Sequence, residues 1–314
     1  MSADVKVLSI TGYTRSGSTL LDTILGSIQG FFSTGELHYL WERGLVQGRR
    51  CGCGELIPRC PTWSAILANA FPEGTPAPER VIALQERCAR TRHTPRLLSA
   101  EEGREQNPAL SAYVDVMRRL YAGIAVTTGA SVIVDSSKRP SDAAIARLVP
   151  GVSAYAVHLV RDPRAVVHSW SRTKAELDRP WATSMPKQSL LFTTFGWAEL
   201  NAMSELVRRR YRDRATLIRY EDLARAADGY VARILDVVEE SGRARPVIRA
   251  DRVRVAANHT VSGNPGRFHT GVLSIRPDDE WRSATSGPRH AAITILTMPL
   301  LLRYGYGLGR GGPS

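Results

Sequence analysis

Lysine is scarce in this chain, and no local concentration of positive charge stands out. Lys and Arg together number 42 against 30 Asp and Glu, for a net charge of +12 over 314 residues, but only four of the basic residues are lysines. The arginines are spread along the chain without an aromatic-rich platform on which bases could stack. A basic chain suits an anionic partner, although a coding bias towards arginine gives the same composition. We therefore expect no nucleic-acid partner.

Long apolar runs are also missing. The longest, 291–302, is well short of the roughly 20 residues that a membrane-spanning helix needs. The N-terminus passes directly into a strand-like run, without the charged region, apolar stretch and cleavage site of a secretory signal. These absences predict a cytoplasmic protein that does not contact a membrane. With 43% hydrophobic residues the chain can bury a large core, and we expect a single domain over residues 1–314.

Cysteine is limited to four residues, three of which cluster as Cys51, Cys53 and Cys60. A metal site in this cluster would need Cys88 or His93 as its fourth ligand. Paired C-x-x-C motifs, the usual sign of a zinc site, are absent. The sequence therefore favours free thiols or one local disulfide, and it predicts no metal.

Alternating strand-like and helix-like segments predict the fold. Val5–Thr11 is a β-branched run that ends at Gly12, and 18–28 carries apolar residues at helical spacing. Further strand-like runs, separated by helical patterns, follow at 31–35, 131–134, 153–160 and 215–218. This alternation is typical of a three-layer α/β fold, in which helices cover both faces of a central parallel sheet and ligands bind beyond the carboxyl ends of the strands. Polar residues that end the strands are thus expected at the site.

Two stretches interrupt this regular alternation. A Pro- and Gly-rich segment at 71–78 leads into helical patterns that continue to residue 128. We interpret 71–128 as a helical insert within the single domain, of a kind that often covers a pocket. A later polar stretch, 258–267, is long enough to be a binding loop.

Residues 12–19, GYTRSGST, have the spacing of a nucleotide phosphate loop, with glycines five apart between a strand and a helix. Backbone N–H groups at a helix start, together with the helix dipole, favour an anion there. The lysine that nucleoside triphosphatases place in this loop is missing, since Ser18 stands there, and Arg15 brings a fixed cation instead. The loop therefore favours a ligand with a shorter anionic chain, such as a phosphosulfate.

Two segments resemble motifs of sulfotransferases that use 3′-phosphoadenosine 5′-phosphosulfate (PAPS). TRSGSTLL at 14–21 resembles their 5′-phosphosulfate loop, and LVRDPRAVVHS at 159–169 resembles their 3′-phosphate motif. The resemblance implies PAPS as donor, its desulfated form PAP as product, no required metal, and a nucleotide held by Arg15, Ser16, Gly17, Ser18, Thr19, Arg161 and Ser169. A guanidinium can fork a phosphate, and each motif ends a predicted strand, so the two together are far more specific than either alone.

Weaker matches extend the resemblance towards the C-terminus. The segment RYEDL resembles one in which a tyrosine, here Tyr220, approaches adenine, and SGNPGRF resembles a late nucleotide loop, here with Asn264 and Arg267. A tyrosine at the core edge and an ordinary turn are the plain structural alternatives. The sequence departs from animal cytosolic members at Leu20, where an aromatic residue often stacks on adenine.

Sulfuryl transfer is a loose, in-line displacement, so the protein mainly positions groups and stabilises charge. Glu36 directly follows the run 31–35 and resembles the glutamate of the Gly-Glu pair in tyrosylprotein and certain bacterial sulfotransferases, which implies that it is the base. A capping or salt-bridged glutamate is the structural alternative, and His38 is the second candidate base. Lys138 is expected to stabilise the moving sulfuryl group, and Arg15 the charge that grows on the oxygen between sulfur and the 5′-phosphate.

Two other classes of function stay open at this stage. A P-loop kinase or ATPase would use Asp135 as its magnesium carboxylate, and a non-catalytic polyanion-binding protein would depend on net charge alone. The missing phosphate-loop lysine favours the sulfotransferase. We expect its acceptor to be a hydroxyl or amine of a small molecule, in a pocket formed by the helical insert and residues 185–195. The sequence does not indicate an oligomeric state.

Overall fold

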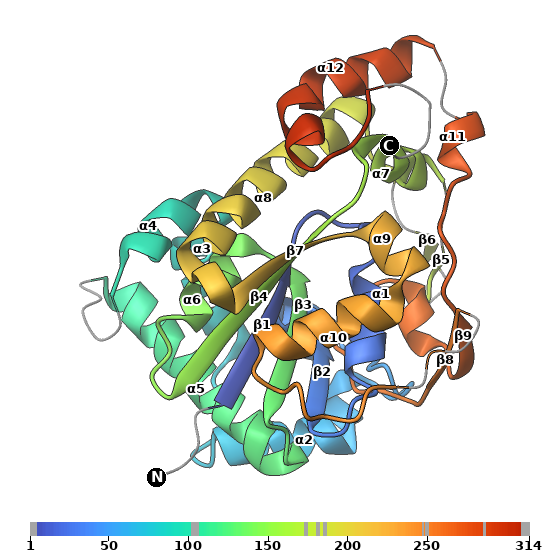
Figure 1. The fold of residues 1–314 in the computed structure, drawn as a ribbon. Coiled ribbons are helices and arrows are strands. Elements are labelled where there is room, and N and C mark those ends of the chain that lie inside the picture. The colour runs from blue at the N-terminus through green and yellow to red at the C-terminus, as the bar shows by residue number, and fades with distance from the viewer. Residues whose placement is uncertain are drawn as a thin grey trace.

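Five parallel strands form the central sheet of the computed structural model, which describes residues 5–101, 107–172, 175–179, 183–184, 187–246, 248, 251–284 and 287–308. The order across the sheet is β2-β3-β1-β4-β7. The strands are β1 (Val5–Thr11), β2 (Phe31–Gly35), β3 (Val132–Lys138), β4 (Val152–Val160) and β7 (Ala215–Arg219). Helices flank this sheet on both sides, so the predicted three-layer α/β fold is confirmed (Figure 1).

Side chains of the central strands divide between two cores, because successive residues of a strand point to opposite faces of the sheet. In β1, Val7 packs into one core while Leu8 packs into the other. In β3, Ile133 and Val134 are divided in the same way. Both faces are therefore apolar, which explains why these strands appear in the sequence as nearly continuous hydrophobic runs.

Helices from different parts of the chain cover the two faces (Figure 1). One face carries α1 (Ser18–Leu25), α9 (Tyr220–Arg225) and α10 (Ala227–Val237), and the other carries α2 (Pro61–Ala70), α5 (Pro108–Thr128) and α6 (Pro140–Ala146). The crossover through α1 leads from β1 to β2 on one side, and the crossover through α6 leads to β4 on the other. Ligands bind beyond the carboxyl edge where the strand order reverses in this way, which here is at β1.

The expected helical insert, 71–128, contains α3 (Pro78–Cys88), α4 (Thr94–Ser99) and α5. Leu120 and Ile124 of α5 are fully buried in the same core as Ile133 of β3. This stretch therefore supplies much of the helical layer on one face of the sheet. Its contribution to the large pocket at the sheet edge is Thr91.

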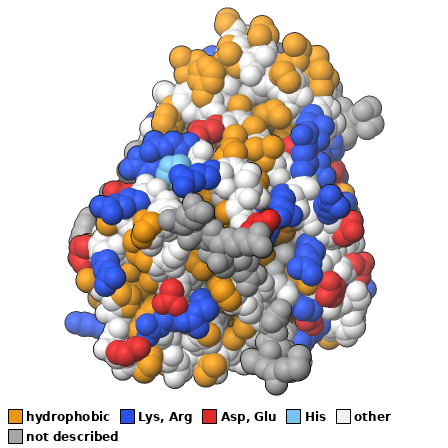
Figure 2. Space-filling view, turned by 90° about the vertical axis from the view of Figure 1, so that its left-hand side faces the viewer, with side chains coloured by type: hydrophobic (Ala, Val, Ile, Leu, Met, Phe, Trp, Pro, Cys, Tyr) orange, Lys and Arg blue, Asp and Glu red, His pale blue; other side chains and the backbone are white. Residues whose placement is uncertain are grey.

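Helices near the C-terminus form a third core beyond the edge of the sheet. α7 (Pro163–Ser171), α8 (Leu190–Tyr211) and α12 (Pro288–Arg303) pack around Trp197, Leu301 and Tyr304. The short helix α11 (Trp281–Ala284) packs against α7. Two short antiparallel pairs are β5 (Ala175–Glu176) with β6 (Thr183–Ser184) and β8 (Arg252–Val255) with β9 (Gly271–Ser274), and the second pair packs into the core that contains α1. On the face shown in Figure 2, hydrophobic side chains gather at the end that holds α12. None of the helices in the described part of the chain has the length and hydrophobicity of a membrane span.

Candidate active site

One large pocket, with a cavity volume of about 680 Å³, lies at the carboxyl ends of the strands. Its walls come from the phosphate loop after β1, the segments that follow β2 and β3, the helix α7 and the loop 263–266. Arg15 and Thr19 line it, and so do Arg161 and Ser169. The two segments that the sequence analysis expected at opposite ends of one nucleotide therefore face the same cavity.

The lining of this pocket is strongly basic. Seven lining side chains are cationic and three are carboxylates: Arg15, Arg43, Arg49, Lys138, Arg139, Arg161 and Arg179, against Glu36, Glu176 and Asp278. A cleft lined by one sign of charge attracts ligands of the opposite sign. The folded chain thus concentrates at one place arginines that are scattered along the sequence.

The phosphate loop is held tightly against the wall of the pocket. Gly17 has a φ of 87°, and a Cβ on this residue would lie 2.4 Å from Cδ2 of Tyr220, so a glycine is required. The guanidinium of Arg15 lies 4.6 Å from the centre of the Trp170 ring. Burial lowers the pKa of Arg15, but a guanidinium remains charged in proteins. The loop therefore presents a fixed cation to the cavity.

Strand register brings Glu36 and Lys138 together. Gly35 of β2 is paired with Asp135 of β3, and Thr11 of β1 is paired with Lys138 after an irregularity in the register. β3 therefore runs beyond the predicted stretch 131–134. Nζ of Lys138 donates to Oε1 of Glu36 at 2.5 Å, and both residues are buried. The predicted base and one predicted charge-stabilising group form one ion pair.

Two cations keep Glu36 ionised. Besides Lys138, Nη1 of Arg43 lies 3.3 Å from Oε2 of the carboxylate. Burial by itself would raise the pKa of Glu36, but the charges of Lys138 and Arg43 outweigh it, and the pKa falls below the usual value for glutamate. Glu36 is therefore unprotonated at neutral pH, as a general base must be before it accepts a proton.

Three residues around the pocket have left-handed backbone conformations. The φ angles are 65° at Arg15, 66° at Lys138 and 43° at Ser262. Such conformations cost about 1–3 kcal/mol each in residues other than glycine, and they concentrate at functional sites. Three of the six non-glycine residues that have positive φ in the described part of the chain thus lie around this pocket.

Arg43 and Ser262 belong to the site although the sequence analysis did not single them out. Oγ of Ser262 accepts a hydrogen bond of 2.7 Å from Nη1 of Arg43, the same nitrogen that contacts Glu36. Arg43 lies in the π-helical segment η2 (Trp41–Val46), and π-helical turns are frequent at functional sites. Ser262 begins the SGNPGRF segment, but no local pattern predicts its contact with Arg43, because the proximity of the two residues depends on the fold.

Another part of the pocket wall, next to the phosphate loop, is formed by Arg161, Ser169 and Tyr220. The guanidinium of Arg161 lies 4.5 Å from the centre of the Tyr220 ring and donates to the carbonyl of Arg15 at 3.0 Å. Its Nη2 lies 2.9 Å from Oδ2 of Asp278. Burial would raise the pKa of Asp278, but the nearby Arg161 lowers it, so the carboxylate is ionised. Arg161 therefore already holds one anion at the pocket wall.

The remaining residues of the phosphate loop and the late loop have distinct positions. Ser18 and Asn264 line the pocket, whereas Oγ of Ser16 is buried and has no hydrogen-bond partner among the described residues. Arg267 is 2% exposed, and its guanidinium donates to the carbonyls of Thr260 and Arg50. Arg267 therefore stabilises the loop through these hydrogen bonds and does not line the pocket. Its direct contact with a nucleotide stays a prediction.

The second candidate base, His38, and the candidate magnesium ligand, Asp135, are not among the residues that line the pocket. Nδ1 of His38 lies 3.0 Å from Oδ2 of Asp142, outside the set of lining residues. Asp135 is buried, and its Oδ1 accepts hydrogen bonds from the backbone N–H and the hydroxyl of Ser137. Burial raises the pKa of Asp135 to about 6. A carboxylate turned inward in this way is poorly placed for a magnesium ion that must also reach the phosphate loop.

The segment 185–195 was expected to contribute to the acceptor pocket. Gln188 lines the cavity and accepts a hydrogen bond from the hydroxyl of Tyr13 at 3.1 Å. Residues 185–186 lie outside the described residues. The described part of this segment thus places one neutral polar side chain at the wall.

A parallel sheet with a glycine-containing loop after β1 and a basic pocket at its carboxyl edge is typical of α/β proteins that bind phosphorylated or sulfated ligands. The model of one family, described as the Sulfotransferase family, matches residues 8–241. The chain belongs to the sulfotransferase family, and the resemblance found in its sequence is confirmed. No curated protein matches the chain.

Solved structures of sulfotransferase domains are similar to this one. The domain from the curacin biosynthetic pathway has 15% sequence identity and a TM-score of 0.53, with 98% of this chain and 99% of that chain covered. The domain from the Synechococcus PCC 7002 olefin synthase has 20% identity and a TM-score of 0.47, with 98% of each chain covered. The first similarity shows that the chain shares the sulfotransferase fold.

Proposed function

We propose that this protein transfers a sulfuryl group from PAPS to a hydroxyl or amine of a small-molecule acceptor. The observation that carries the proposal is that the phosphate loop and the pair Arg161 and Ser169 line one cavity. A Cβ built on Gly263, in the wall of this cavity, would lie 3.8 Å from Oγ1 of Thr19 and 3.9 Å from Oε1 of Glu36. The loop and the candidate base therefore flank the same point.

The residues present fit a doubly phosphorylated adenosine. The start of α1 offers backbone N–H groups to the 5′-phosphosulfate, and the buried hydroxyl of Ser16 has no protein partner among the described residues. Arg161 offers a planar fork for the 3′-phosphate, with Ser169 beside it. Arg161 is paired with the carboxylate of Asp278 in this structure. The 3′-phosphate would therefore displace this carboxylate, so that one anion replaces another at Arg161.

PAPS would supply a sulfuryl group activated by its bond to a phosphate. In the transfer, the acceptor oxygen or nitrogen bonds to sulfur as the bond from sulfur to the 5′-phosphate oxygen breaks in line, and PAP leaves with the negative charge. The negative charge on that oxygen is stabilised by Arg15, the loop N–H groups and the hydroxyls of Ser18 and Thr19. The ammonium of Lys138 stabilises the sulfuryl group between the two, so positioning and charge account for the rate.

Glu36 takes the proton that the acceptor loses. Its low pKa makes it a weak base towards a free hydroxyl, but the acidity of the acceptor rises as its oxygen bonds to sulfur. Nζ of Lys138 holds Oε1 of Glu36 by a hydrogen bond of 2.5 Å. The contact from Arg43 to Oε2 is longer, at 3.3 Å, so Oε2 can accept a further hydrogen bond from the acceptor. The ion pair thus orients the base as well as keeping it ionised.

A comparison of nucleotides by thermal shift tests the proposal. PAP without magnesium is expected to raise the melting temperature, because a ligand at 100 times its Kd adds about 2.7 kcal/mol of stability. ADP and 5′-AMP should stabilise less, since they lack the 3′-phosphate. Stabilisation by ATP with magnesium but not by PAP would overturn the proposal in favour of a kinase or ATPase. Salt-sensitive binding of heparin with no effect of any nucleotide would overturn it in favour of a polyanion-binding protein.

A further inference from the structure

Three cysteines and one histidine form a cluster outside the large pocket. Cys51, Cys53, Cys60 and His259 each direct one potential ligand atom to a common point, and these four atoms lie within 4.8 Å of one another. The cysteines belong to the segment around η3 (Ile57–Arg59), while His259 comes from the loop that precedes η6 (Pro265–Phe268). The fourth member is therefore neither Cys88 nor His93. Sγ of Cys88 instead donates to the carbonyl of Leu84.

Three of the six separations within the cluster match those of a tetrahedral site. With Zn–S bonds of about 2.3 Å and Zn–N bonds of about 2.05 Å, two sulfur ligands lie about 3.8 Å apart, and a sulfur and a nitrogen lie about 3.5 Å apart. The Sγ atoms of Cys53 and Cys60 are 3.8 Å apart. Nδ1 of His259 lies 3.4 Å from Sγ of Cys60 and 3.8 Å from Sγ of Cys51. The side chains are thus arranged around a point that a metal ion can occupy without moving them far.

One of the three sulfur positions lies at the start of a helix. Cys60 is the N-cap of the ten-residue helix α2, whose dipole stabilises a negative charge at this end. A coordinating metal ion deprotonates a thiol, so the three cysteines would bind the ion as thiolates.

The ring of His259 is oriented like that of a metal ligand. Its Nε2 lies 3.2 Å from Oγ1 of Thr62, while Nδ1 faces the sulfurs. A hydrogen bond at one ring nitrogen, with the other directed to the metal, is the usual arrangement of a metal-binding histidine.

We propose that Cys51, Cys53, Cys60 and His259 bind one structural Zn²⁺ ion. Three thiolates and one imidazole complete a tetrahedron, so all four positions are filled by protein and no position stays open for a substrate. Soft sulfur ligands in tetrahedral geometry select zinc over magnesium or calcium. Binding releases three thiol protons to solvent, and no oxidation or reduction is involved.

The ion would fasten the late loop of the active site to the segment that contains the cysteines. The backbone N–H of Gly52 donates to the carbonyl of Thr260 at 3.0 Å, and a Cβ on Gly52 would lie 1.9 Å from Oδ1 of Asn258. Nε1 of Trp63 donates to the carbonyl of His259 at 2.7 Å. The chain then continues within three residues to Ser262, which contacts Arg43 beside the base. The metal thus has a defined structural task, which is to hold this loop at the pocket.

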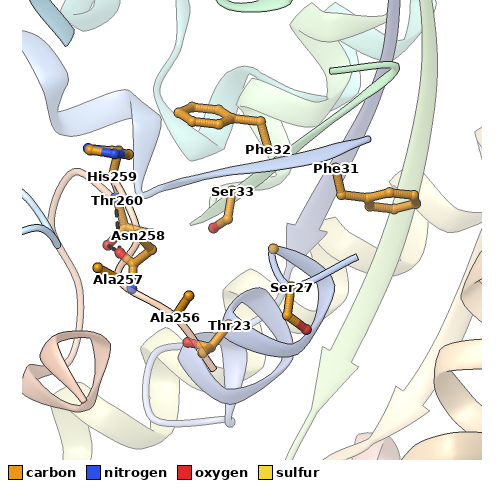
Figure 3. A pocket seen from close by; sticks show the side chains of 11 residues that line it. Thr23, Ser27, Phe31, Phe32, Ser33, Ala256, Ala257, Asn258, His259 and Thr260 are labelled. Carbon is orange, nitrogen blue, oxygen red and sulfur yellow. Dashed lines mark hydrogen bonds between the residues drawn. The ribbon is translucent and has the colours of Figure 1, made fainter. Parts of the chain in front are cut away.

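On the side of β2, the loop donates a hydrogen bond of 2.8 Å from Val261 to the carbonyl of Thr34, but residues 256–258 border a cavity. Ala256, Ala257 and Asn258 of the loop and Ser33 of β2 line a small cavity of about 130 Å³. Figure 3 shows these loop residues in a row with His259 at one end. The side of the loop that faces this cavity is therefore incompletely packed. The cluster on the His259 side is then an important anchor for the segment.

Metal analysis of the intact, untagged protein, purified without chelator, tests the proposal. Elemental analysis is expected to find one zinc per chain, and the variants Cys51→Ser and His259→Gln are expected to lose most of it. Cys88→Ser is the matched control, since it removes a buried thiol outside the cluster, and it should keep one zinc. Less than about a tenth of a zinc per chain in the parent protein, even after incubation with zinc, overturns the proposal. A disulfide between two of the clustered cysteines, found by mass spectrometry of the alkylated protein, overturns it as well.

Cobalt substitution covers the case in which the variants do not fold. The parent protein reconstituted with Co²⁺ is expected to show the absorption of tetrahedral cobalt with thiolate charge-transfer bands, and added zinc should abolish it. A spectrum typical of octahedral cobalt with oxygen ligands would contradict the site. PAP binding is measured on the same preparations to separate this proposal from the assignment of PAPS as the donor. A protein that binds PAP but takes up no zinc would refute the zinc site alone.

Discussion

Nζ of Lys138 and Oε1 of Glu36 are 2.5 Å apart, although the two residues are separated by 102 positions in the chain. The parallel register of β2, β3 and β1 creates this contact, because both residues lie at the carboxyl edge of the sheet. A buried ion pair is costly to desolvate and contributes little net stability. Its retention next to a phosphate loop is more readily explained by chemistry than by folding.

Replacing Glu36 tests its assignment as the base. Glu36→Gln keeps the shape of the side chain but cannot accept the acceptor proton, so kcat is expected to fall by about 10²–10⁴-fold. PAP affinity should change little, because the phosphate contacts are intact. Glu42→Gln, at an exposed glutamate six residues further on, is the control and should keep the parental kcat. Parental turnover by Glu36→Gln would require a different base.

Asp278 competes with the nucleotide for Arg161. Its carboxylate is about one-third exposed, with 35% of the side chain accessible, so its attraction to Arg161 is partly screened. Asp278→Asn should therefore strengthen PAP binding by about fivefold, corresponding to roughly 1 kcal/mol, as measured by isothermal titration calorimetry. Asp115→Asn, at an exposed carboxylate on α5, should change nothing. Weaker binding in Asp278→Asn would mean that the aspartate helps to hold the nucleotide.

The close approach of Gly17 to Tyr220 predicts a steric requirement in the phosphate loop. Gly17→Ala would place a Cβ 2.4 Å from the tyrosine ring at a φ of 87°, so PAP binding should fall at least tenfold and stability by about 1–3 kcal/mol. Gly48→Ala is a matched control, because Gly48 also has a positive φ of 59° but no neighbour within 4 Å of a new Cβ. It should lose stability only. Equal PAP binding by both variants would show that the packing of this loop does not matter.

Asp22 gives the protein a defined dependence of stability on pH. The residue is buried in α1, and burial raises its pKa from 3.8 to about 7, although hydrogen bonds from Ser33 and Ser136 oppose the shift. Because the folded state holds this proton more tightly than the unfolded state, the stabilisation is complete below pH 4 and is lost as the pH rises to 7. Asp22→Asn should remove that loss. The difference in unfolding free energy between variant and parent should grow by on the order of 3 kcal/mol from pH 4 to pH 7, as measured by urea denaturation. A constant difference would show that Asp22 titrates normally.

Much of the architecture could be predicted from the sequence because its signals are local. The run Val5–Thr11 followed by the glycine loop predicts strand, turn and helix, and the structure has β1 and α1 there. The left-handed turn at Lys138 and its pairing with Glu36 depend on an irregular strand register, which no local pattern encodes. The extension of β3 beyond 134 has the same cause.

Long-range packing explains the residues that the sequence left unassigned or assigned differently. Arg267 lies in a motif that resembles a nucleotide loop, yet the fold directs its guanidinium to backbone carbonyls. His259 joins the cysteine cluster from a position 199 residues after Cys60, so no spacing rule could have found it. Arg43 and Ser262 are likewise adjacent only in the folded chain.

The affinity of PAP and of 5′-AMP for the parent protein and for Arg161→Ala tests the central claim most directly. Isothermal titration calorimetry should show PAP weakened by about 10–150-fold in the variant, the loss expected for hydrogen bonds to a charged group of roughly 1.5–3 kcal/mol. Binding of 5′-AMP, which has no 3′-phosphate, should change less than about twofold, and Arg118→Ala on the exposed surface of α5 should match the parent for both. Equal losses for the two nucleotides, or no loss for PAP, would contradict the claim that Arg161 and the phosphate loop hold opposite ends of one donor.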